Sequence, residues 1–248
     1  MLMQPFIRFE HVVKAFGQNQ VYRDLSLDII KGETLTLIGG SGTGKSVLLK
    51  LLLGLMKADA GKISFDGQEV GSLSHADLIQ MRKRIGMLFQ GAALFDSLTV
   101  FENIAYPIRE HFDYEESKIS NIVAEKLSVV GLPGIENMMP SDLSGGMKKR
   151  VGLARAIATD PEVILYDEPT TGLDPTNTIR IDQLILDLQK RFQVTSIVVT
   201  HDMASAFRVS DRLALLYDKK IEYVGSKEEM QNSSNQIVQQ FINGRIGE

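Results

Sequence analysis

The chain has 248 residues, 44% of them hydrophobic, which suits a large α/β domain with a sizeable buried core and excludes a disordered or fibrous protein. The net charge of −4 provides no global basic field, so nonspecific binding to nucleic acid is not expected. The sequence has no cysteine, which excludes disulfides and thiolate metal sites and is compatible with a reducing compartment.

Neither a secretory signal nor a membrane span is expected from the sequence. Met1–Phe6 has no basic segment followed by an apolar one. The most apolar stretch, Val47–Met56, is interrupted by Lys50 and is far shorter than the roughly 20 apolar residues that cross a bilayer. Any role at a membrane is therefore expected to depend on a partner protein.

The first predicted elements are β-strands. Phe6–Val12 alternates apolar and polar residues, as a half-buried strand does, and Val21–Ile30 predicts a pair of short strands. Farther along, Ile63–Phe65 and Gln68–Val70 flank Asp66-Gly67, a typical hairpin turn. The chain therefore opens with β structure. 

Phe16 lies 29 residues before Lys45 in this β-rich part. Its ring is a candidate to stack on an adenine base, and an ordinary hairpin aromatic is the alternative. The residues around Phe16 do not decide between the two.

A complete phosphate loop, G-x-x-x-x-G-K-[ST], lies between the strand-like run Thr34–Ile38 and the helix-like run Val47–Leu53. Its residues are Gly39, Gly40, Ser41, Gly42, Thr43, Gly44, Lys45 and Ser46. The glycines let backbone N–H groups turn toward a β-phosphate, and the helix N-terminus adds a favourable dipole. Lys45 is expected to reach the β- and γ-phosphates and Ser46 to hold Mg²⁺. The sequence predicts a nucleoside triphosphate and Mg²⁺ site over these residues and Val47.

Polar residues follow three apolar runs that read as buried strands of a parallel sheet. The runs are Ile85–Phe89, Val163–Tyr166 and Thr195–Val199. Gln90 follows the first and is placed to face a ligand at the carboxyl edge of the sheet. Asp167, at the end of the second, can hold Mg²⁺ or its water, and Glu168 can act as general base on the attacking water. His201, after the third, is expected to contact the γ-phosphate.

The pattern between residues 91 and 160 is helical, which predicts a helical lobe inserted into the α/β core. The expected helices are Val100–Ile108, Glu116–Val130 and Gly145–Ala158, separated by Pro107, Pro133-Gly134 and Pro140. Elsewhere, helices are expected at His75–Arg84, Asn177–Arg191 and Met203–Val209, and a last strand pair at Leu213–Tyr217 and Lys220–Val224. In the tail, Ile237, Phe241 and Ile242 have the spacing of a short amphipathic helix.

The stretch Leu143–Met147 predicts a second anion site. Ser144 can cap a helix whose first N–H groups are left bare by Gly145 and Gly146. With this stretch, residues 6–225 resemble the ABC family of ATPases. The other motifs of that family are present in the same order along the chain: the phosphate loop, Gln90, Asp167-Glu168, Leu173-Asp174 and His201.

The resemblance implies an α/β fold: a P-loop NTPase core with a mainly parallel sheet, an N-terminal antiparallel β subdomain and an inserted α-helical subdomain. It implies one nucleotide-binding domain, with residues 1–90 and 161–224 as catalytic core and β subdomain, 91–160 as helical subdomain and 225–248 as tail. Two such domains form a head-to-tail dimer, in which the signature residues Ser144, Gly145, Gly146 and Met147 act on the partner's ATP. By the same resemblance Phe16 stacks on adenine, Gln90 binds Mg²⁺ and couples ATP to a permease, and Asp174 lies in the dimer loop.

Several stretches are similar to a narrower branch, the ATPases of Mla-type or Mce-associated lipid transporters. They are Gly39–Ser41 with Val47, Phe89–Val100, Met147 and Gln240–Gly244. This branch implies phospholipid transport with an MlaE-like integral membrane permease, an extracytoplasmic MlaD-like Mce subunit and a small soluble MlaB-like subunit. The chain would then lie at the cytoplasmic face of the inner membrane. For residues 225–248, a regulatory contact and a frayed helix remain alternatives.

Two other functions share these motifs. A small-solute importer ATPase has every catalytic residue in common, and only the segment after Gln90, Met147 and the tail argue against it. A soluble ABC ATPase acting on DNA or ribosomes is disfavoured, because only 54 residues separate Gln90 from Ser144 and only one phosphate loop is present.

Overall fold

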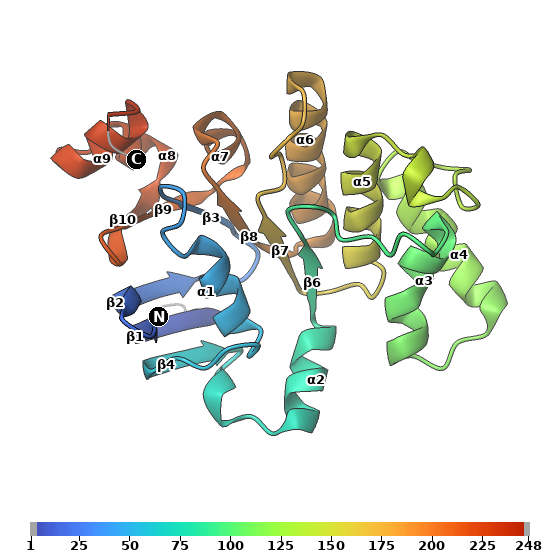
Figure 1. Ribbon diagram of the computed structural model, residues 1–248, viewed down its shortest axis with the longest axis horizontal. Coiled ribbons are helices and arrows are strands. Elements are labelled where there is room, and N and C mark those ends of the chain that lie inside the picture. Colours follow the sequence, from blue (N-terminus) through green and yellow to red (C-terminus); the bar gives the residue numbers. More distant parts are fainter. Residues whose placement is uncertain (1–3, 246–248) are drawn as a thin grey trace. The chain divides into compact units, whose positions relative to one another are not determined.

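Figure 1 shows the computed structural model of the chain, which describes residues 4–245. The chain forms two compact units: the first combines the residues up to Arg82 with those from Thr195 onward, and the second spans residues 83–194. The segment Met1–Phe6 and the tail 225–248 each extend at one end beyond the described residues. The subdomain boundaries expected at residues 91, 160 and 225 stay predictions.

The first unit contains an antiparallel sheet with the order β2-β1-β4-β5. Strands β2, β1 and β4 of this sheet are labelled in Figure 1. Its strands are β1 (Ile7–Phe16), β2 (Asn19–Ile29), β4 (Ala60–Phe65) and β5 (Gln68–Glu69). Asp66 and Gly67, between β4 and β5, both have positive φ, as the expected hairpin turn requires. The expected pair of short strands over residues 21–30 was wrong. A single strand runs through, because shifts in its register against β1 absorb the local irregularity.

Parallel strands in the first unit carry the phosphate loop. They are β3 (Thr34–Ile38), β8 (Thr195–Thr200) and β9 (Arg212–Tyr217). A further strand, β10 (Lys220–Ser226), pairs antiparallel with β9. Every residue of β3 and β8 is buried, as expected for strands covered on both faces. Ile38 pairs with Thr200, so Gly39 and His201 leave their strands at the same edge.

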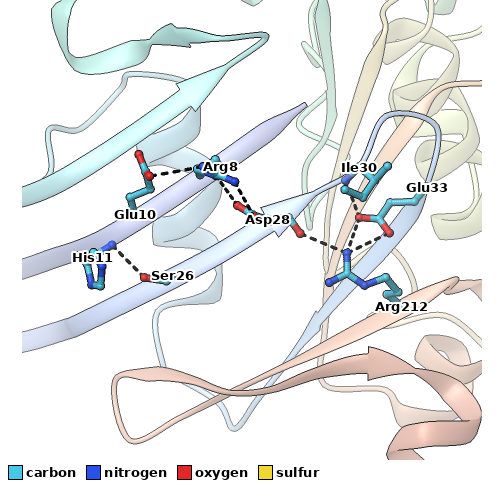
Figure 2. Close-up of polar contacts among 8 residues, drawn as sticks. All are labelled: Arg8, Glu10, His11, Ser26, Asp28, Ile30, Glu33 and Arg212. Atoms are coloured by element: carbon cyan, nitrogen blue, oxygen red, sulfur yellow. Dashed lines mark hydrogen bonds and ion pairs between the residues drawn. The ribbon is translucent and has the colours of Figure 1, made fainter. Parts of the chain in front are cut away.

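Arg212 on β9 links this parallel group to the antiparallel sheet (Figure 2). Its Nη1 donates to the main-chain oxygen of Asp28 at 3.3 Å and to the Glu33 carboxylate at 3.1 Å. Burial raises the pKa of the Glu33 carboxyl, and the Ile30 N–H and Arg212 oppose that rise. Arg8 on β1 in turn holds Asp28 through two hydrogen bonds of 2.8 and 3.0 Å. The two sheets of the first unit are thus joined by charged groups.

The helices of the first unit include a tail that packs on the core. The helices are α1 (Lys45–Leu52), η1 (Val70–Ser72), α2 (His75–Lys83, which ends one residue beyond the unit), α7 (Met203–Val209), α8 (Lys227–Gln231) and α9 (Gln236–Ile242). Val238 and Phe241 of α9 join a buried cluster with Leu213 and Leu215. The alternative of a frayed terminal helix is therefore wrong for the described residues. Helix α8 was not expected, although Ser226 and Glu229 form its capping box.

The second unit combines two parallel strands with helices. Its elements are β6 (Ile85–Leu88), β7 (Val163–Asp167), α3 (Val100–His111), α4 (Glu116–Val129), η2 (Pro140–Asp142), α5 (Gly145–Ala156) and α6 (Pro175–Phe192). Pro107 was expected to separate helices but lies inside α3. Ile104 and Ile108 on either side of it are buried, and their packing outweighs the hydrogen bond that proline removes. Over residues 4–245, no helix combines the length and apolar character needed to cross a membrane.

Candidate functional site

The phosphate loop joins β3 to α1 in the first unit and is shaped by close contacts to its glycines. Gly42 and Gly44 have φ of 74° and 103°, a conformation that favours glycine. A Cβ on Gly44 would lie 2.3 Å from the Val21 side chain, so no larger residue fits. The Tyr22 hydroxyl donates to the Gly44 carbonyl at 2.6 Å. Val21 and Tyr22 of β2 thus contact the loop at Gly44. Tyr22 supports the loop but was not expected from the sequence.

The Lys45 side chain folds back over the loop. Its Nζ donates to the carbonyls of Gly39 and Gly40, both at 2.9 Å, and the residue is only 7% exposed. The Thr43 hydroxyl also donates to the Gly40 carbonyl, at 2.9 Å. These bonds satisfy the carbonyls of Gly39 and Gly40, while the N-terminus of α1 provides the dipole that favours an anion.

Two more predicted residues belong to the first unit. Phe16 ends β1 and its ring is 45% exposed, with Lys14 Nζ 5.3 Å from the ring centre. An exposed ring suits stacking on a base better than it suits core packing. His201 is exposed and directly follows β8, and Asp202 after it caps α7.

The second unit holds the predicted carboxylate pair. Asp167 ends β7, and Glu168 follows with a φ of 50°, in the left-handed region. Glu168 is 9% exposed, and its Oε2 accepts a hydrogen bond from the Thr171 hydroxyl at 3.0 Å. Its main-chain oxygen accepts from the Thr171 N–H at 3.3 Å. Thr171 is not among the residues expected from the sequence, although its position three residues after a carboxylate at a strand end was a usable signal.

Gln90 lies just beyond β6 with an exposed side chain. The Lys149 ammonium donates a hydrogen bond to its main-chain oxygen. Ala92 and Ala93 then have φ of 61° and 48°, and Arg155 donates to both of their carbonyls at 2.7 Å. Left-handed alanines are costly, so these charge-assisted bonds stabilise an unfavourable backbone.

The predicted second anion site is the N-terminus of α5. The Ser144 hydroxyl accepts from the Met147 N–H at 3.3 Å, as expected for a cap. Gly145 is exposed, whereas a Cβ on Gly146 would come within 2.7 Å of the Asn177 carboxamide. Asp174 orients Asn177 by accepting from its N–H at 3.0 Å and from its side chain at 2.5 Å.

The hydrogen bonds from Asn177 hold the pKa of Asp174 below its ordinary value.

The predicted site residues fall into two groups. Phe16, the phosphate loop and His201 belong to the first unit, and Gln90, Ser144–Met147, Asp167-Glu168 and Asp174 belong to the second.

Known proteins resemble the chain over nearly all of its length. Residues 22–171 match the family model described as ABC transporter. The chain is 43% identical over 245 residues to the probable ribonucleotide transport ATP-binding protein mkl of Mycobacterium leprae, covering 99% of this chain and 71% of that protein. It is 42% identical over 241 residues to the intermembrane phospholipid transport system ATP-binding protein MlaF of Haemophilus influenzae, covering 97% and 91%.

A solved structure confirms the fold class. The ATP-binding cassette MJ0796, in a dimeric post-hydrolysis state bound to ADP and Pi, matches with a TM-score of 0.81 and 30% identity, covering 89% of this chain and 98% of that one. The expected P-loop NTPase core with an antiparallel β part and an inserted helical part is therefore confirmed. On this evidence the chain belongs to the ABC transporter family, in which it is a nucleotide-binding, ATP-hydrolysing cassette.

Proposed function

We propose that this chain is the ATPase subunit of a transporter that moves phospholipid across the bacterial envelope, to maintain outer-membrane lipid asymmetry or lipid supply. One observation carries the proposal: the 42% identity to a phospholipid transport ATP-binding protein extends over 97% of this chain and 91% of that protein. The match extends over nearly the whole of both chains and is not confined to the catalytic motifs.

In this proposal ATP binds to the phosphate loop. Phe16 stacks on adenine, the main chain of Gly39–Gly44 with Val47 surrounds the phosphates, and Lys45 moves from the loop carbonyls to the β- and γ-phosphate oxygens. His201 contacts the γ-phosphate. The exposed ring of Phe16 and the helix N-terminus beneath the loop support these assignments.

The residues proposed for Mg²⁺ are Ser46, Gln90 and Asp167. Their hydroxyl, amide and carboxylate oxygens are the hard donors that Mg²⁺ takes in proteins, so the donor set fits the ion. Bound there, Mg²⁺ would neutralise charge on the phosphates. Glu168 is the proposed general base on the attacking water, and its carboxylate is oriented by Thr171.

A second copy of the chain is the proposed partner across the nucleotide. Ser144, Gly145, Gly146 and Met147 would then bind the γ-phosphate held by the other copy, and Asp174 would lie at the dimer loop. The dimeric state of the related cassette and the exposed Ser144 and Gly145 support this arrangement. ATP would join the two copies, and hydrolysis would separate them because two anions replace one ligand.

An exposed aromatic patch is the proposed docking surface for the permease. We define the patch as Phe95 and Tyr106, two large side chains that are each more than 40% exposed. Their rings lie 5.1 Å apart. Two exposed rings in contact, in the helical part that follows the proposed coupling residue Gln90, favour a protein contact.

The proposed partners are an MlaE-like permease, an MlaD-like Mce subunit outside the cytoplasm and a small MlaB-like subunit. They would hold the chain at the cytoplasmic face of the inner membrane. No nucleic acid is proposed as a partner.

Transport of a small solute is the second candidate. The observation that favours it is the 43% identity to a protein named for ribonucleotide transport. The catalytic residues are the same in both cases, so only the cargo and the partner subunits distinguish them.

The test is purification of the tagged chain from its native membrane in detergent, with mass spectrometry of copurifying proteins and lipids. A permease, an Mce-type subunit and bound phospholipid would support phospholipid transport. A permease with a small-solute binding protein and no lipid would replace it with the second candidate.

A further inference from the structure

Lys149 is a buried cation in the second turn of α5, five residues after Ser144. It is 5% exposed, and its neighbours Lys148 and Arg150 are both more accessible. Burial lowers the pKa of the Lys149 ammonium, and the nearby carboxylates of Glu168 and Asp167 oppose that shift. A cation in such a place is costly unless its hydrogen bonds are satisfied.

Two main-chain carbonyls satisfy Lys149. Its Nζ donates to the oxygen of Gln90 and to that of Glu168, the latter at 3.1 Å. Gln90 follows β6 and Glu168 follows β7, two strands that pair in parallel. One ammonium on the helix that begins at Ser144 therefore bridges the segments that follow both strands.

Arg155, farther along α5, provides an internal comparison. It binds the carbonyls of Ala92 and Ala93, so it holds the segment after Gln90. None of the hydrogen bonds found for Arg155 in residues 4–245 reaches Glu168. Among the hydrogen bonds found for α5 in that range, only those of Lys149 join Gln90 and Glu168.

We propose that Lys149 is a positioning residue for ATP hydrolysis, which fixes the main chain of Gln90 and Glu168 to the helix that carries the signature residues. The inference rests on the proposed roles of Glu168 and Ser144. When Ser144 binds the partner's nucleotide, the position of α5 is transmitted through Lys149 to the general base of its own site. Because Lys149 acts on the alignment of Glu168, its loss lowers kcat and leaves ATP binding intact.

The experiment measures steady-state ATPase activity of the assembled complex, purified with the full-length chain as wild type, Lys149→Met, Lys149→Arg and Lys148→Met. Methionine keeps an unbranched side chain but removes the donors, and arginine restores donors for two carbonyls. We expect Lys149→Met to lower kcat by about 10-fold to 100-fold with KM for ATP within about threefold of wild type. Lys149→Arg should recover kcat to within about threefold, and Lys148→Met should match wild type.

Wild-type kcat in Lys149→Met, an equal loss in Lys149→Arg, or an equal loss in Lys148→Met would overturn the proposal. If Lys149→Met does not fold, Lys149→Gln replaces it: its amide is shorter than lysine and cannot span both carbonyls, so unchanged kcat there overturns the proposal as well. Glu168→Gln is measured in parallel. An active Glu168→Gln is a failure of the proposed function, which assigns Glu168 as the general base. If the wild type is active, Glu168→Gln is inactive and Lys149→Met is unaffected, this inference alone fails.

Discussion

The Thr171 hydroxyl donates a hydrogen bond of 3.0 Å to the Glu168 carboxylate, which fixes one oxygen of the proposed general base. The same threonine donates its N–H to the Glu168 main-chain oxygen. Glu168 has a left-handed backbone, so this short turn determines where its carboxylate points.

Replacing Thr171 by valine should reduce kcat by about 5-fold to 30-fold, because it removes a hydrogen bond that contributes about 1–2 kcal/mol. ATP affinity should change little. Steady-state ATPase assays with the matched Thr171→Ser variant check this: serine keeps the hydroxyl and should remain near wild type. Equal activity of the valine and serine variants would remove Thr171 from the orientation of Glu168.

Glu168→Gln should retain ATP binding but abolish turnover, because the amide is nearly isosteric and cannot accept the proton from water. A closed dimer should then accumulate with ATP. Size-exclusion chromatography with light scattering, with and without Mg-ATP, measures the dimer, and phosphate release measures turnover. Wild-type turnover in this variant would remove Glu168 from the mechanism.

Ser144→Arg should abolish most ATPase activity of the assembled complex while each chain still binds ATP at its own phosphate loop. The bulky cation blocks the exposed N-terminus of α5, which is proposed to bind the partner's nucleotide. Equilibrium binding of a fluorescent ATP analogue serves as the control. Unimpaired activity of the complex would count against a nucleotide site shared by two copies.

Gly86→Ala should destabilise the protein by about 1–3 kcal/mol, because a Cβ on β6 would lie 2.1 Å from the Ala156 carbonyl oxygen. The matched control is Gly71→Ala, whose Cβ would meet no atom closer than 3.9 Å. Denaturant unfolding of both variants gives the comparison. Equal stabilities would mean that β6 and the end of α5 are not packed this closely in solution.

Phe241→Ala should lower stability by about 3 kcal/mol, because the ring packs in the cluster with Leu213 and Leu215. The exposed neighbour Gln240 provides the control, and Gln240→Ala should be close to wild type. Hydrogen exchange of the α9 amides gives a second measure, since a packed helix is protected. Unprotected amides together with unchanged stability would restore the frayed-helix interpretation.

Most elements of the fold follow from local pattern and could be predicted. The bounds of α7 were predicted to the residue, and the phosphate loop was recognised from its residue types and their spacing between a strand and a helix. The helix end expected at Pro107 was wrong, because proline indicates a helix end only from local sequence. The burial of Ile104 and Ile108 is a tertiary effect that the local sequence does not reveal.

The supporting contacts of the site could not be predicted for the same reason. Lys148, Lys149 and Arg150 form one basic run, and only the rotation of α5 decides that Lys149 faces the carbonyls of Gln90 and Glu168. Tyr22 lies 22 residues from Gly44, and its hydroxyl contact depends on how β2 packs beneath the loop.

The first unit is formed by two separate stretches of the chain, so it cannot fold completely until the second stretch has been synthesised. Strand β3 carries the phosphate loop, yet its partners β8 and β9 begin at Thr195 and Arg212. At about 5–20 residues per second, a ribosome needs on the order of 10 s or more to supply them. Throughout that time Leu35 and Leu37 have no native strand to pair with, so the nascent chain exposes an apolar β segment that chaperones can bind. The nucleotide site can form only after most of the protein has left the ribosome.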